Sequence, residues 1–74
     1  MSTSELDGVI ERLLPQVLAD RDLGDGRRFT RLHLDRLWAL SCLQVGECYD
    51  PELLAQHIRH RLPAKVQDVC TPHA

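Results

Sequence analysis

The segment from Leu32 to Val45 constrains this chain most, because it has too many apolar residues for a helix with a single buried face. Nine of its fourteen residues are apolar: Leu32, Leu34, Leu37, Trp38, Ala39, Leu40, Cys42, Leu43 and Val45. At about 100° per residue, these side chains scatter around most of the helix circumference. Such a helix needs cover on more than one side, and a chain of 74 residues has little of its own to provide it. The surplus indicates a partner, either a second copy or a different protein.

The segment before it predicts a helix over residues 4–21, because its apolar residues recur at spacings of three and four. They are Leu6, Val9, Ile10, Leu13, Leu14, Val17 and Leu18. Pro15 falls on the side opposite this stripe, where a bend would wrap the helix around a core. The alternative is a break at Leu14 with a new helix beginning at Pro15.

A second helix is expected over residues 31–45. Thr30 can cap its first turn, and Phe29 before the cap can pack on Leu34 as a hydrophobic staple. Gly46 stands where a left-handed residue would end the helix.

A third helix is expected over residues 51–62. Asp50 supplies its cap and Pro51 its first helical residue, and Pro63 discourages continuation. Apolar residues spaced by three after Pro63 allow a short fourth helix over residues 64–70.

These helices and short connections favour an all-α fold, a small three-helix antiparallel bundle with that possible fourth helix. Residues 1–74 form one domain in this interpretation, and the tail 71–74 frays. A domain of this size is marginally stable alone and often gains stability by association.

Surplus apolar side chains and amphipathic rings mark the expected contact surface. We expect partner binding by surplus apolar residues of the second helix and by the start of the third: Leu34, Trp38, Leu40, Leu53, His57 and His60. Trp38 is the first candidate, since tryptophan is enriched in interface hot spots, although an ordinary core tryptophan is the equal alternative. A homodimer and a complex with another protein, as an adaptor, inhibitor or assembly subunit, both fit this pattern.

DNA binding by a helix-turn-helix is the alternative function. Its basic residues would be Arg27, Arg28, Arg31, Arg59, Arg61 and Lys65. The net charge of −2 argues against a dedicated nucleic-acid binder. The third helix would also begin with Asp50 and Glu52, at the end that usually contacts bases.

Metal binding and catalysis have weaker signals. Cys42, Cys48, His57 and His60 are ligand types that zinc prefers, but the two cysteines are spaced too far apart for a usual site. Cys42 is more simply a small core residue. We therefore expect no metal and no cofactor, and without a phosphate-binding loop or a nucleophile motif we expect no enzyme.

The compartment expected from the sequence is the cytoplasm. The first residues lack the basic and apolar regions of a signal peptide, and no apolar run is long enough to span a membrane. Three cysteines, Cys42, Cys48 and Cys70, show no disulfide-framework spacing.

Overall fold

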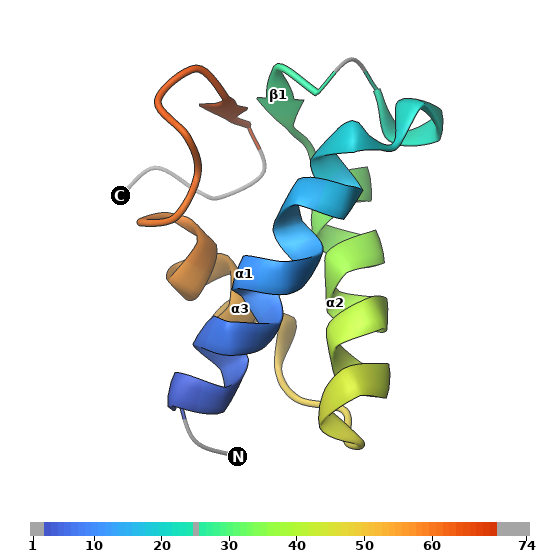
Figure 1. Cartoon of the computed structure of the whole chain (residues 1–74), viewed down its shortest axis with the longest axis vertical. Coiled ribbons are helices and arrows are strands. Elements are labelled where there is room, and N and C mark those ends of the chain that lie inside the picture. The colour runs from blue at the N-terminus through green and yellow to red at the C-terminus, as the bar shows by residue number, and fades with distance from the viewer. Residues whose placement is uncertain (1–2, 25, 70–74) are drawn as a thin grey trace.

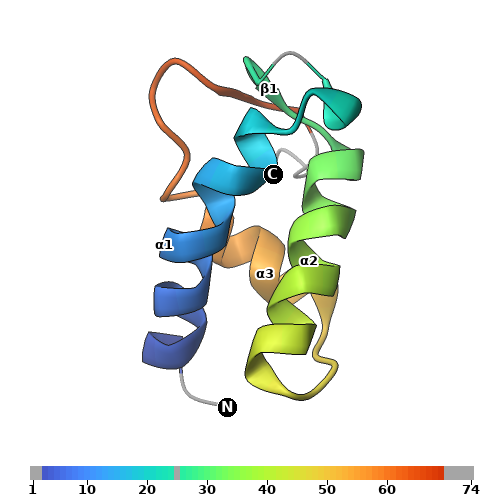
Figure 2. The ribbon, with the colours of Figure 1, turned by 45° about the vertical axis from the view of Figure 1, so that its right-hand side comes forward.

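The computed structural model describes residues 3–24 and 26–69. Its elements are α1 (Thr3–Ala19), the 3₁₀ helix η1 (Arg21–Leu23), β1 (Arg28–Phe29), α2 (Arg31–Val45), α3 (Pro51–Ile58) and β2 (Gln67–Asp68). The chain is mostly helical, as expected. The α1 and α2 helices lie side by side and run in opposite directions, and α3 lies across them on one side (Figures 1 and 2). Within the described residues, no helix is long and apolar enough to cross a membrane.

The α1 helix continues through Pro15, so the alternative break at Leu14 does not occur. Pro15 is exposed, and the carbonyl that loses its helical hydrogen bond therefore faces water. The opposite stripe is buried, with Leu6 and Ile10 fully inaccessible. Burial of this stripe against α2 and α3 stabilises a helix whose interior proline would otherwise destabilise it.

The α2 helix begins with a reciprocal cap around Thr30. The Thr30 N–H donates to Nδ1 of His33 over 3.1 Å, and the Thr30 hydroxyl lies 2.8 Å from the same nitrogen. The Phe29 ring is buried and lies 5.8 Å, centroid to centroid, from the His33 ring. At the other end, Gly46 adopts a left-handed φ of 86°, and its N–H donates to the Cys42 carbonyl.

The expected fourth helix is wrong over residues 64–69, where the structure has a turn and then β2. β2 pairs in parallel with β1, and the Gln67 N–H donates to the Arg27 carbonyl over 2.8 Å. Buried Val66 joins the core just before this pair, so tertiary packing decides the local conformation. Residue 70 of the expected helix and the tail 71–74 lie outside the described residues.

The α3 helix ends at Ile58, four residues before the expected end at residue 62. The Arg61 and Leu62 N–H groups both donate to the Ile58 carbonyl, so the chain tightens into a turn. Pro63 prevents the helix from resuming beyond this turn, because the residue before a proline is disfavoured in helical conformation and the proline itself cannot donate.

The core lies where the three helices meet β1 and the chain around Val66. Its buried apolar residues are Leu6, Val9, Ile10, Leu13, Leu14, Val17, Phe29, Leu34, Leu37, Leu54, Ala55, Ile58 and Val66. Residues from every helix contribute, which explains why none of the helices needs to be stable alone.

A side chain at Gly26 is expected to lower the stability of the fold more than one at Gly46. A Cβ there would lie 2.8 Å from the Leu18 carbonyl oxygen, and the Gly26 φ of 79° is strained for other residues. Gly46 is the matched control, because its φ of 86° is similar but nothing lies within 4 Å of its Cβ position. We expect Gly46→Ala to lower the free energy of unfolding by about 1 kcal/mol, and Gly26→Ala by about 1–2 kcal/mol more. Urea denaturation measures both, and equal losses would contradict the Leu18 contact.

Candidate functional site

Three apolar side chains of α2 point away from the core and form what we call the outer face of α2. They are Leu32, Ala39 and Leu43, and Leu32 and Leu43 are 61% and 80% exposed. Their spacing of seven and four residues places them on one stripe of the helix. The buried stripe with Leu34 and Leu37 lies on the opposite side of the same helix.

The expected partner-binding residues of α2 and α3 lie mostly elsewhere. Leu34 is only 4% exposed and belongs to the core, so its prediction as a contact residue is corrected. Trp38, Leu40 and Leu53 are half-buried and pack against the core. The periodicity of Leu32, Ala39 and Leu43 could have identified the outer face from the sequence, since all three lie opposite Leu37 on a helical projection.

Trp38 is held by a polar network that joins α2 to the connection before α3. Its indole Nε1–H donates to the Tyr49 carbonyl over 2.8 Å. The buried Ser41 hydroxyl donates to the Trp38 carbonyl over 2.9 Å and lies 2.5 Å from the Tyr49 hydroxyl. Because Ser41 has one proton to donate, Tyr49 donates to Ser41 in this arrangement. Trp38 therefore has a structural role, because it positions the connection between α2 and α3.

The Tyr49 hydroxyl is expected to stabilise this connection measurably. Tyr49→Phe removes one hydrogen bond to buried Ser41, so we expect the free energy of unfolding to fall by about 1 kcal/mol. Urea denaturation of this variant, of Ser41→Ala and of the double variant measures the coupling. Fully additive losses would contradict a direct Tyr49–Ser41 interaction.

The same interaction gives a pH dependence. Burial raises the pKa of Tyr49 above its ordinary value. The folded state therefore favours the neutral phenol. This preference stabilises the fold fully below the pKa of Tyr49 in the unfolded chain, about 10. The stabilisation is lost as the pH rises through the higher pKa of Tyr49 in the folded state. The stability difference between the wild type and Tyr49→Phe should shrink over that alkaline range.

His57 and Arg61 both contact the Asp7 carboxylate and so join α3 and the following turn to α1. The His57 Nδ1 lies 2.9 Å, and an Arg61 guanidinium nitrogen 3.2 Å, from the same Asp7 oxygen. An open cleft of about 330 Å³ lies here, lined also by Gln56 and exposed His60. The two histidines lie together at one surface, but His57 also has a structural partner in Asp7.

The structure brings Cys42 close to Cys48 and places His57 and His60 at one cleft, but it does not assemble all four residues of the zinc alternative into one site. Among the described residues, no group of three or more histidine, cysteine or acidic side chains could hold a metal ion. Burial raises the pKa of the Cys42 thiol above its ordinary value, and Cys48 is exposed.

The basic residues of the DNA alternative are partly occupied by carboxylates. Arg31 lies 3.4 Å from Asp35 on the same helix, and Arg61 is held by Asp7. Asp50 caps α3 by accepting from the Glu52 N–H over 3.0 Å, so that helix begins with acidic side chains, as expected. These contacts do not favour a phosphate-binding surface on α3.

Comparison with known proteins finds no matching family model, no significantly similar curated protein and no significantly similar solved structure.

Proposed function

We propose that this protein is a small non-enzymatic helical interaction module whose outer face of α2 binds a second copy of the chain. The observation that carries this proposal is the exposure of Leu32 and Leu43 on one helical stripe, at 61% and 80%. Covering these side chains removes apolar surface from water, which is the main driving force of association.

A second copy is favoured as the partner because the stripe can match itself. In an antiparallel two-fold arrangement, Leu32 of each copy lies against Leu43 of the other. Ala39 lies near the middle, where its small side chain allows the helices to approach closely. Arg31 and Asp35 place a positive and a negative side chain beside the stripe. In a dimer, Arg31 of one copy can therefore face Asp35 of the other.

The surrounding residues have supporting roles in this proposal. The helices form a small antiparallel bundle that supports the outer face of α2. Half-buried Trp38 and Leu40 flank this face. Leu53, His57 and His60 form a separate contact area for a later partner, consistent with an adaptor or assembly subunit. The thiols of Cys42 and Cys48 suit a reducing compartment such as the cytoplasm.

The proposal is tested by sedimentation equilibrium of the wild-type chain over about 1 µM to 1 mM. A contact based on one helix face is small, so we expect a reversible dimer with a dissociation constant of about 1–100 µM. A monomer at every concentration would contradict self-association. An association that weakens steeply with salt would indicate charge pairing rather than apolar contact.

A further inference from the structure

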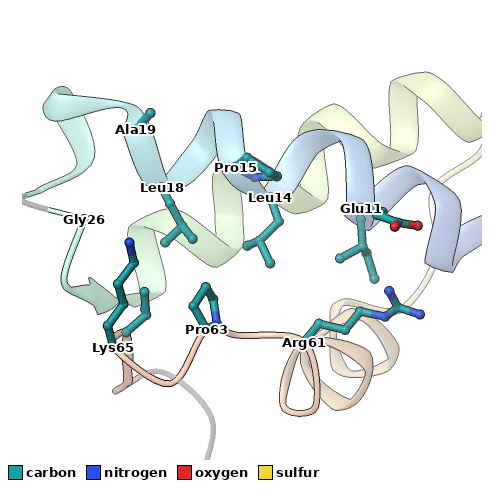
Figure 3. A pocket seen from close by; sticks show the side chains of 11 residues that line it. Glu11, Leu14, Pro15, Leu18, Ala19, Gly26, Arg61, Pro63 and Lys65 are labelled. Carbon is teal, nitrogen blue, oxygen red and sulfur yellow. The ribbon is translucent and has the colours of Figure 1, made fainter.

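A groove of about 550 Å³ separates α1 from the chain that follows α3. Leu14 and Leu18 line it from α1, and Pro63 lines the opposite wall (Figure 3). Val66, three residues after Pro63, also lines the groove. Its volume lies within the range of about 300–1,000 Å³ that is usual for small-molecule sites. Apolar walls on both sides favour an occupant with an aliphatic body.

The two ends of this groove differ in their charged side chains. At one end, Arg61 lies below Glu11 and is held by Asp7 over 3.2 Å, so cation and carboxylates offset one another there (Figure 3). At the other end, Lys65 extends toward Gly26. The ion pairs found within the described residues do not include Lys65. The Lys65 end is therefore the positive end of the groove, in a chain whose net charge is −2.

We propose that the groove binds a free alkyl carboxylate, with its chain along Leu14 and Leu18 and its carboxylate at Lys65. The lining residues of α1 extend from Ile10 to Ala19, which is about 13 Å at the helical rise. An alkyl chain of medium length fits such a span. A peptide fits less well, because its backbone N–H and C=O groups would lack partners along apolar walls.

The test is a titration with dodecanoate, below its micelle concentration, followed by amide correlation spectra. We expect saturable shifts around Leu14, Leu18 and Val66. Dodecyltrimethylammonium has the same alkyl chain with a cationic head, and we expect it to bind at least about tenfold more weakly.

Charge reversal at the groove tests the assignment of Lys65. Lys65 is exposed, so Lys65→Glu should fold normally and should reverse the preference between the two head groups. Arg21→Glu is the matched control, since Arg21 is also exposed but lies outside the groove, and it should leave the preference unchanged. The absence of saturable shifts, equal affinity for both head groups, or an unchanged preference in Lys65→Glu would each overturn the proposal.

Discussion

Leu37→Ala is expected to lower the free energy of unfolding by about 2–5 kcal/mol, whereas Leu43→Ala on the same helix should change it by at most about 0.5 kcal/mol. Leu37 is fully inaccessible and Leu43 is 80% exposed. The first substitution leaves a cavity in the core, while the second removes methyl groups that already contact water in the single chain.

The loss at Leu37 is large relative to the whole domain. At about 0.05–0.15 kcal/mol per residue, a chain of this length has an unfolding free energy of about 4–11 kcal/mol. Urea denaturation at a protein concentration well below the measured dissociation constant, where the proposed dimer is dissociated, separates folding from association. Equal losses for Leu37→Ala and Leu43→Ala would contradict the assignment of inner and outer faces on α2.

Leu43→Asp is expected to abolish self-association while leaving the helical content unchanged. In the antiparallel arrangement, the two-fold axis places the new carboxylate against Leu32 of the other copy at both ends of the contact. Burying an unpaired charge costs several kcal/mol, so we expect the dissociation constant to rise at least about a hundredfold. Sedimentation equilibrium measures this change, and circular dichroism checks the fold.

Val69→Asp is the matched control for that substitution. Val69 is also an exposed apolar residue, at 46%, but it follows β2 and lies outside α2. It should leave the dimer intact. Equal weakening by Val69→Asp and Leu43→Asp would indicate a general effect of added negative charge and would contradict a specific contact through the outer face of α2.

The helices could be predicted from the sequence because their signals are local. The apolar spacing around Leu6 and Ile10 specified the buried stripe of α1, and Thr30 and Gly46 marked the two ends of α2. Pro15 was correctly placed on the exposed side of a continuous helix. Each of these signals operates within a few residues, where spacing and capping chemistry decide the conformation.

The β1–β2 pair could not be predicted in the same way. Phe29 and Asp68 are register partners far apart in the chain, and two-residue strands have no periodicity of their own. Buried Val66 suggested a helix by its spacing from Val69, but it packs into the core ahead of a strand instead. Contacts between distant segments outweigh weak local preference here.

The candidate contact surface was only partly accessible to sequence reasoning. The surplus of apolar residues on α2 was visible, but its division between core and surface depends on where α1 and α3 pack. Buried Ser41 shows why, because a hydroxyl occupies a core position through its hydrogen bonds to Trp38 and Tyr49. A polar residue inside and leucines such as Leu43 outside reverse the usual pattern.

The most direct test of the outer face of α2 is an isotope-filtered NOE measurement on a mixture of labelled and unlabelled chains. This experiment detects only contacts between different copies. We predict intermolecular contacts between the methyl groups of Leu32 and Leu43, with further contacts at Ala39. Intermolecular contacts confined to other surfaces, or none in a sample concentrated well above the expected dissociation constant, would contradict the proposed interface.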